Sequence, residues 1–326
     1  MHLKNKLLYL FLLLLVLLPL PTYAYSQYVI PGGETVGIKV NSKGVMVVGF
    51  YPVDNHYIGK DAGFNLGDII TKVNNVKVNS IEEMVSSLEG QESNIKVTID
   101  RNNESKELTL NLKLDKDNVY KTGLYVKDKI NGIGTLSYID PVSKIYGALG
   151  HEIDEKNTMQ KFEIKDGTIF KAEITSITKS QNGTPGEKEA RFFSDTIYGT
   201  IKENTKSGIF GVYEEELPNK NAIEVAQPNT IKLGKAYIRT VISGDTVEEF
   251  EINILKLDSN NKEKNILFEI TDQNLLDKTG GVVQGMSGSP IIQNDKLIGA
   301  VTHVVVNDSK KGYGIFITTM LDEGEN

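Results

Sequence analysis

The sequence predicts a mainly β protein with two domains that follow an N-terminal apolar segment. Its 326 residues are enough for two domains, each with its own core. Short runs of β-branched and aromatic residues dominate the chain, and clusters of Gly, Asn, Asp and Pro separate them. No long amphipathic helix interrupts these runs after residue 123. Many short strands with turn residues between them are typical of β-barrels and sandwiches.

Residues 1–24 have the composition of a signal peptide or an N-terminal membrane anchor. The basic start MHLKNK precedes the apolar run LLYLFLLLLVLLPL, which is as long as a signal-peptide core and short for a full membrane span. Thr22-Tyr23-Ala24 loosely fits a small-x-small cleavage site. We therefore expect export across the cytoplasmic membrane, with the segment either removed or kept as an anchor.

The first folded domain is expected at residues 25–115. Asn74-Asn75 is a two-residue turn that tolerates positive φ, as a β-hairpin requires. Ser80 and Glu83 form a capping box at the start of a short helix. The expected elements are strands at residues 36–40, 45–50, 69–73 and 76–78, a helix at 80–88, and strands at 95–99 and 108–114.

This order of elements, with the motif A-G-x-x-x-G-D-x-I at residues 62–70, resembles a PDZ domain. The resemblance implies that an extended peptide, often the C-terminus of another protein, adds as a strand beside the helix. The alternative is a degenerate PDZ domain that only packs against its neighbour. The candidate peptide-binding edge is Gly37, Ile38, Lys39 and Val40, and the candidate groove wall is Met84, Val85 and Leu88.

The second domain is expected at residues 116–326, after a charged linker. No repeat or low-complexity tract appears in it, and we expect a β-barrel or a sandwich. Its clearest strand runs are residues 124–126, 134–138, 169–174, 208–213, 236–242, 250–255 and 266–270.

Composition excludes several classes of function. The net charge of -7, with only three arginines, argues against a nucleic-acid partner because phosphate binding needs a cationic face. The chain has no cysteine, which excludes disulfides, thiol nucleophiles and Cys-ligated zinc. It has no H-E-x-x-H pair, so we expect neither a metal nor a cofactor. Catalysis must then use serine, carboxylates and the histidines, which are His2, His56, His151 and His303.

The segment GMSGSP at residues 285–290 is a candidate nucleophile turn. An acyl-transfer enzyme exposes its serine while backbone N–H groups face the developing oxyanion. Glycines at 285 and 288 tolerate the dihedral angles of such a turn, which makes Ser287 the candidate nucleophile. The amides of Gly285 and Ser287 are the candidate oxyanion donors. The G-x-S-x-G elbow of α/β-hydrolases is not matched, because Ser289 occupies its last position.

A serine nucleophile needs a base, and His151 is the candidate. It follows the small-residue run GALG and precedes Ser287 by 136 residues. In the chymotrypsin-like template the histidine also comes first, at an interval of roughly 138 residues. This order favours a chymotrypsin-like β-barrel for the second domain.

Four segments together resemble the stage IV sporulation protein B peptidases. They are GALGHEI at 147–153, TGGVVQGMSGSPI at 279–291, GAVTHV at 299–304 and GYGIFI at 312–317. The layout is similar too, with an apolar N-terminus, a PDZ domain and a serine peptidase domain. The resemblance implies an endopeptidase exported from the forespore into the intermembrane space. It also implies that the enzyme cleaves itself and a membrane-embedded regulator, so that an intramembrane protease processes a mother-cell sigma factor.

The third catalytic residue has two candidates. The family pattern places an aspartate shortly before T-G-G, which falls on Asp272, with Asp277 close by. The chymotrypsin-like template instead expects the acid roughly 45 residues after the histidine, near Asp195. The acid would hold His151 in the correct tautomer.

His303 lies 16 residues after Ser287 and is a candidate for the wall of the specificity pocket. The hypothesis rests on exported glutamate-specific serine proteases, which also read G-x-S-G-S-P and carry a histidine at a similar offset. A structural histidine in the core is the alternative.

Two other functions compete with the family assignment. A general extracytoplasmic quality-control protease with a PDZ domain is one, although such proteins usually place PDZ domains after the protease. A non-catalytic PDZ scaffold is the other, and the intact Ser287 and His151 argue against it. In the favoured assignment the partners are peptide or protein substrates, a second copy of the protein and, through an uncleaved N-terminus, the membrane.

Overall fold

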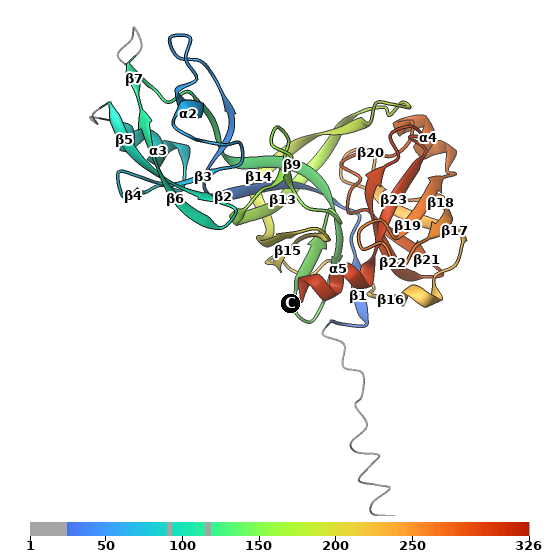
Figure 1. Cartoon of the computed structure of the whole chain (residues 1–326). Coiled ribbons are helices and arrows are strands. Elements are labelled where there is room, and N and C mark those ends of the chain that lie inside the picture. Colours follow the sequence, from blue (N-terminus) through green and yellow to red (C-terminus); the bar gives the residue numbers. More distant parts are fainter. Residues whose placement is uncertain (1–24, 90–92, 115–118, 326) are drawn as a thin grey trace, which may run out of the picture.

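The computed structural model describes residues 25–89, 93–114 and 119–325, so the predicted leader at 1–24 lies outside the described residues. Strands dominate, as the sequence predicts. None of the described helices is long and apolar enough to cross a membrane. Figure 1 shows a smaller unit that projects from a larger β body, with strands β2 and β9 running between the two.

Six antiparallel strands close on themselves to form what we term the first barrel. The ring order is β2, β9, β10, β15, β14, β13 and back to β2. The interior is apolar and includes Val36, Ile38 and Val40 of β2. The strands are β2 (Thr35–Phe50), β9 (Leu124–Ile139), β10 (Ile145–Ala148), β13 (Ile164–Thr178), β14 (Gly186–Thr205) and β15 (Gly208–Tyr213).

A second ring of six antiparallel strands forms the second barrel. Its order is β17, β18, β19, β23, β22, β21 and back to β17. Isoleucines and phenylalanines of alternate strand positions fill it. The strands are β17 (Gly234–Val241), β18 (Val247–Leu257), β19 (Ile266–Ile270), β21 (Pro290–Gln293), β22 (Lys296–Val304) and β23 (Lys311–Phe316). The predicted mainly β fold is confirmed, and both rings close as the predicted chymotrypsin-like β-barrel requires.

Short elements join the two barrels. β1 pairs with β9 of the first barrel and with β16, while β16 pairs with β22 of the second. β20 pairs in parallel with β14 and precedes the GMSGSP turn. The remaining short elements of the two-barrel body are β1 (Tyr28–Pro31), β11 (Asp154–Glu155), β12 (Gln160–Lys161), β16 (Ile223–Val225), η1 (Pro228–Thr230), α4 (Gln273–Thr279), β20 (Val283–Gln284) and α5 (Ile317–Gly324).

The smaller unit, which we term the inserted unit, comprises residues 43–126. It has its own apolar core, built around Ile70, Met84 and Ile99. Ser80 accepts a hydrogen bond from Glu83 N–H at the start of α3, as the capping box predicts. Besides the ends of β2 and β9, its elements are α2 (Ile58–Asp61), β3 (Ile69–Val73), β4 (Val76–Lys77), α3 (Ile81–Leu88), β5 (Asn94–Arg101), β6 (Glu104–Asn111), β7 (Lys113–Leu114) and β8 (Tyr120–Lys121).

The predicted peptide-binding edge at Gly37, Ile38, Lys39 and Val40 is wrong. These residues pair with β9 on one side and with β13 on the other, so both edges of this segment are occupied. Without it the first barrel would not close. The strand pairings therefore place residues 35–42 in the first barrel, whereas the expected domain boundary assigned residues 25–115 to one unit.

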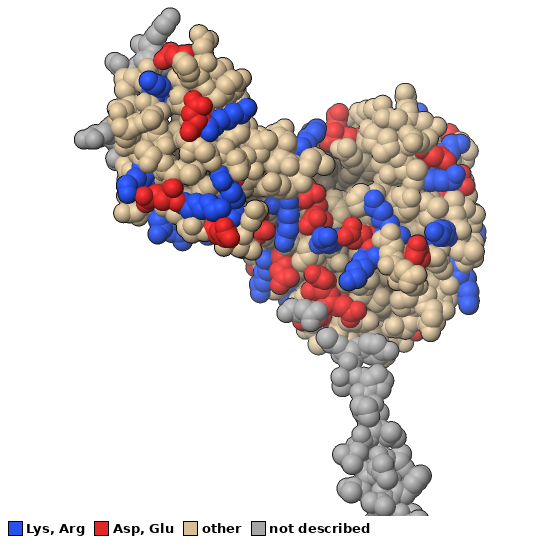
Figure 2. Space-filling model, in the orientation of Figure 1, with Lys and Arg blue, Asp and Glu red and all other residues tan. Residues whose placement is uncertain are grey.

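Charged side chains are spread over the surface of both bodies. Figure 2 shows Lys and Arg interspersed with Asp and Glu on the face in view, and no extended basic area covers it.

Candidate active site

A cavity of about 410 Å³ lies between the two barrels. From the first barrel and the loop that follows β10 it is lined by Ile133, Leu149 and His151. From the second barrel and the turn before β21 it is lined by Ser287 and His303. The sequence separates the candidate nucleophile from the candidate base by 136 residues, and the fold brings both to one site.

The nucleophile turn depends on two glycines with positive φ. Gly285 has φ 94° and Gly288 has φ 93°, a conformation that L side chains rarely adopt. A Cβ on Gly288 would lie 2.0 Å from the Thr135 carbonyl oxygen, so the close approach of the two segments also requires glycine. Ser289 N–H donates to the Met286 carbonyl oxygen and closes the turn around Ser287.

Strand β9 holds the carbonyl oxygens of this turn. Thr135 Oγ1 donates to the Gly285 carbonyl at 2.8 Å, and Thr135 N–H donates to the Ser287 carbonyl at 2.9 Å. Ser137 Oγ donates to the Gly288 carbonyl at 2.8 Å. Ser287 N–H has no acceptor among the described residues, so it is available to an oxyanion. Sequence reasoning missed Thr135 and Ser137, although hydroxyl residues two apart share one face of a strand.

His151 is held as a neutral base. Its Nδ1 lies 2.7 Å from the Glu152 carbonyl oxygen, which only accepts, so Nδ1 carries the proton and Nε2 has the free lone pair. Burial lowers the pKa of His151, against smaller raising effects of the Glu152 backbone and the Asp154 charge. The imidazole is therefore in the form that accepts a proton from a nucleophile.

Ser287 is not hydrogen-bonded to His151. Its Oγ donates to the Thr302 carbonyl oxygen of β22 at 2.9 Å. Rotation about χ1 would free the hydroxyl from Thr302 and turn it toward another acceptor in the cavity. Nucleophile and base thus line the same cavity without a hydrogen bond between them.

His303 faces the same cavity from β22, and its ring centroid lies 5.2 Å from that of His151. Burial lowers the pKa of His303 to about 4, with smaller lowering effects from the neighbouring His151 and Lys264. Its Nδ1 is buried without a hydrogen-bond partner among the described residues. A neutral imidazole with an unused nitrogen is available to a substrate group, so a role in the specificity pocket stays a prediction.

Asp272 does not line the cavity that holds His151, so its place in the triad stays a prediction. Asp272 is the N-cap of α4, and its carboxylate accepts from Leu275 N–H at 3.0 Å. Asp277 accepts from Gln273 on the surface of the same helix. Asp195 is an exposed residue of β14. The carboxylates that line the cavity are Glu152 and Asp154, which sequence reasoning did not single out.

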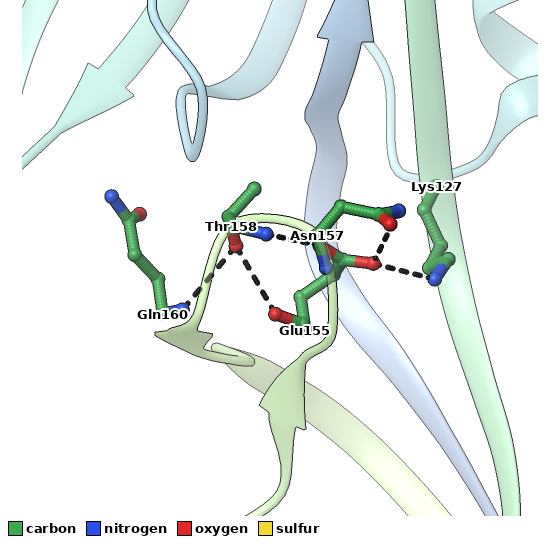
Figure 3. Close-up of polar contacts among 5 residues, drawn as sticks. All are labelled: Lys127, Glu155, Asn157, Thr158 and Gln160. Atoms are coloured by element: carbon green, nitrogen blue, oxygen red, sulfur yellow. Dashed lines mark hydrogen bonds and ion pairs between the residues drawn. The ribbon is translucent and has the colours of Figure 1, made fainter.

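The loop after His151 continues into the β11–β12 hairpin, which Glu155 anchors. The Glu155 side chain is fully buried and accepts from Lys127 Nζ of β9 at 2.7 Å (Figure 3). Its other oxygen accepts from the Asn157 and Thr158 N–H groups at 2.8 and 2.9 Å. The far end of the hairpin touches the inserted unit, since a Cβ on Gly67 would meet the Gln160 side chain.

A buried lysine lies behind the nucleophile turn and was also missed. Lys188 of β14 is 1% exposed, and its Nζ donates to Thr240 Oγ1 at 2.7 Å. Its alkyl chain packs on Gly285, where an added Cβ would lie 3.1 Å from Lys188 Cδ. Burial alone lowers the pKa of Lys188 to about 7.

The predicted groove wall of the inserted unit contains both buried and exposed residues. Met84 and Leu88 are buried in its core, whereas Val85 is 52% exposed. Helix α3 lies beside β9, because Ile81 N–H donates to Asp128 Oδ2 at 2.9 Å. The strand next to the helix is thus β9 and not residues 37–40.

Two family models match the chain. Residues 118–321 match the model described as SpoIVB peptidase S55, and residues 35–114 match the PDZ domain model. No curated protein matches it.

Several solved structures are similar over part of their length. The PDZ domain of the SdrC-like protein from Listeria monocytogenes is 18% identical, with a TM-score of 0.23, and the match covers 27% of this protein and 90% of that one. The Rv3671c protease from M. tuberculosis in its active form is 15% identical, with a TM-score of 0.34 and coverage of 60% and 74%. Its inactive form is 14% identical, with a TM-score of 0.32 and coverage of 59% and 83%.

Proposed function

Because the chain belongs to the SpoIVB peptidase S55 family and is a serine peptidase with a PDZ domain, we propose that it is an exported endopeptidase of sporulation signalling. It cleaves itself and a membrane-embedded regulatory protein, and this cleavage leads to activation of an intramembrane protease and processing of a mother-cell sigma factor. It acts in the intermembrane space of the sporangium. The family match and the signal-peptide composition of residues 1–24 support this proposal.

The catalytic part of the proposal is carried by one observation, the meeting of Ser287 and His151 in the cavity between the barrels. His151 Nε2 takes the proton from Ser287 Oγ, which attacks the substrate carbonyl carbon. Ser287 N–H, with Gly285 N–H as the second candidate, donates to the oxyanion of the tetrahedral intermediate. His151 then returns the proton to the leaving amine, and water hydrolyses the acyl-enzyme by the same steps.

The Glu152 carbonyl oxygen occupies the place that a carboxylate has in a Ser-His-Asp triad. It accepts from His151 Nδ1–H and so fixes the ring orientation and tautomer. A neutral carbonyl stabilises the imidazolium less than a carboxylate does, and the charge of Asp154 adds to that stabilisation from nearby. We propose Ser287 and His151 as a dyad with Glu152 and Asp154 as its supporting groups.

We test the nucleophile with a fluorescent fluorophosphonate, which labels activated serines, on residues 25–326. We expect labelling of the wild type and none of Ser287→Ala. Because Ser287 is a small turn residue, its replacement should leave the unfolding temperature unchanged within about 2 °C. Labelling of Ser287→Ala would assign the nucleophile elsewhere.

The self-cleavage part needs a separate experiment. Wild-type protein is mixed with a tagged Ser287→Ala protein, and intact masses are followed over time. We expect fragments of the tagged protein only when the wild type is present. If the fluorophosphonate labels the wild type but the tagged protein stays intact, the self-cleavage part of the proposal is wrong. Cleavage of unrelated unfolded proteins by that wild type would then support a general quality-control peptidase.

A further inference from the structure

Strand β9 has one edge in the first barrel and one edge facing the active site. Leu136 N–H donates toward β2, to the Glu34 carbonyl oxygen at 3.0 Å, whereas Thr135 N–H donates away from it, to Ser287. Because the backbone groups of a strand alternate in direction, residues of the same parity as Thr135 also point away from β2. These residues are Ile133, Asn131 and Lys129.

The outward groups of these three residues are unused. No strand pairs with β9 on this side at residues 129–133, and no hydrogen bond joins their N–H or C=O groups to another described residue on that side. Lys129 and Asn131 are exposed, and Ile133 is half-buried. Free edges of this kind pair readily with an extended peptide.

This edge begins beside the inserted unit and ends at the nucleophile. Asp128, the residue before it, accepts from the N-terminus of α3. At its other end Ile130, Gly132 and Ile133 line the cavity that holds Ser287 and His151. A Cβ on Gly132 would meet nothing within 4 Å, so the face of β9 is open at this position. Figure 1 shows β9 crossing from the inserted unit to the body that holds the site.

We infer that the peptide substrate adds to β9 as an antiparallel strand along Lys129 to Ile133, on its way to Ser287. This inference rests on the proposed peptidase function and assigns the main-chain binding site of its substrate. The pairing uses the outward N–H and C=O groups of alternate β9 residues and does not depend on the side chains of the substrate. The five residues span roughly 13 Å, which is enough for four or five substrate residues.

The direction of the substrate follows from the direction of β9. All partners of β9 are antiparallel, and antiparallel pairing is the more common kind. Since β9 runs toward Ser287, an antiparallel partner runs away from it. The substrate residues on this edge are therefore those that follow the scissile bond, and they lead toward α3 of the inserted unit.

The test removes one outward N–H group and keeps the hydrogen bonds between β9 and β2. Asn131→Pro removes an N–H that does not bond to β2, and proline is tolerated at such edge positions. Asn131→Ala is the matched control, because it keeps the N–H. The substrate is unfolded, fluorescein-labelled casein, and the fluorophosphonate reports the state of Ser287 independently of any extended substrate.

We expect the fluorophosphonate to label Asn131→Pro and Asn131→Ala alike, and Asn131→Pro to cleave casein with a kcat/KM about tenfold lower than that of Asn131→Ala. Equal casein cleavage by Asn131→Pro and wild type would overturn the inference. A wild type that the fluorophosphonate does not label would instead refute the proposed function.

A second measurement does not depend on the folding of the proline variant. Hydrogen exchange is followed in Ser287→Ala with and without unlabelled casein. We expect casein to slow exchange in the segment that contains residues 129–133. Casein-dependent protection that spares this segment would overturn the inference, because bound substrate would then lie elsewhere.

Discussion

At the scale of single residues, Asp272 has two candidate roles, as the catalytic acid and as the N-cap of α4. Its carboxylate caps α4, which leads through Gly280 to the nucleophile turn. We expect Asp272→Asn to keep the cap and the labelling of Ser287, since Asn is as good an N-cap as Asp. Asp272→Ala should lose about 1 kcal/mol of unfolding free energy. Urea unfolding and fluorophosphonate labelling measure the two effects.

A different outcome would change the assignment of the acid. If Asp272→Asn kept the stability of the wild type but lost its labelling, the negative charge itself would be needed. Asp272 would then be the acid that supports His151.

Lys188 gives a pH dependence with a defined sign. Its pKa is about 7 in the folded protein against about 10.5 when exposed, so between these values the unfolded state binds a proton that the folded state does not. The unfolding free energy should therefore rise with pH from about 7 to about 10. Below pH 7 the destabilisation caused by burying Lys188 does not change with pH. Lys188→Met should remove this rise and stabilise the protein by roughly 3–5 kcal/mol at pH 7, less about 1 kcal/mol for the lost bond to Thr240.

Urea unfolding of the wild type and of Lys188→Met between pH 6 and pH 10 measures the difference in their unfolding free energies. Groups that titrate alike in the two proteins cancel in this difference. Parallel pH profiles would mean that Lys188 keeps its proton in the folded protein. A more stable Lys188→Met that labels more slowly would indicate that the lysine is retained for the support it gives to Gly285.

The residues that sequence reasoning found at the site are those that chemistry restricts to few types. A nucleophile between glycines and a histidine after a small-residue run are visible in the sequence. Thr135, Glu152 and Lys188 act through a backbone carbonyl or through packing, and such roles leave no pattern in a single sequence. The role of Asp272 as the catalytic acid stays a prediction, because the same residue type serves as an acid and as a helix cap.

At the scale of elements, the support that β9 gives to the nucleophile turn is testable. Thr135→Val keeps the shape of the side chain but leaves the Gly285 carbonyl oxygen without its donor. One lost hydrogen bond in a buried site should slow fluorophosphonate labelling roughly tenfold. Thr135→Ser restores the hydroxyl and should restore most of the rate, which separates loss of the bond from loss of packing.

The strands themselves were largely predictable, because β-branched runs between turn residues mark them clearly. Their pairing was not. Residues 36–40 have the alternation of a half-buried strand, and that pattern fits a PDZ edge as well as a barrel. What decides between them is the long-range partner, here β13, which lies more than a hundred residues away in the sequence.

At the scale of the whole molecule, the strand pairings describe one unit inserted into a hairpin of the first barrel. Val40 of β2 lies opposite Ile130 of β9, and the inserted unit, residues 43–126, lies between them in the sequence. A fragment that begins at residue 116 lacks the β2 segment of the first barrel and exposes its apolar interior. We expect that fragment to be unfolded or aggregated.

Joining Val40 to Ile130 through Asn-Gly should instead give a folded double barrel. The two residues face each other as a hydrogen-bonded pair, the geometry that a two-residue type I′ turn closes. The shortened protein loses Lys127, so the buried Glu155 loses its ion-pair partner, and we expect it to be less stable by roughly 2–4 kcal/mol. Circular dichroism, thermal unfolding and labelling of Ser287 compare it with the fragment that begins at residue 116. A folded fragment together with an unfolded shortened protein would mean that residues 35–40 belong to the inserted unit after all.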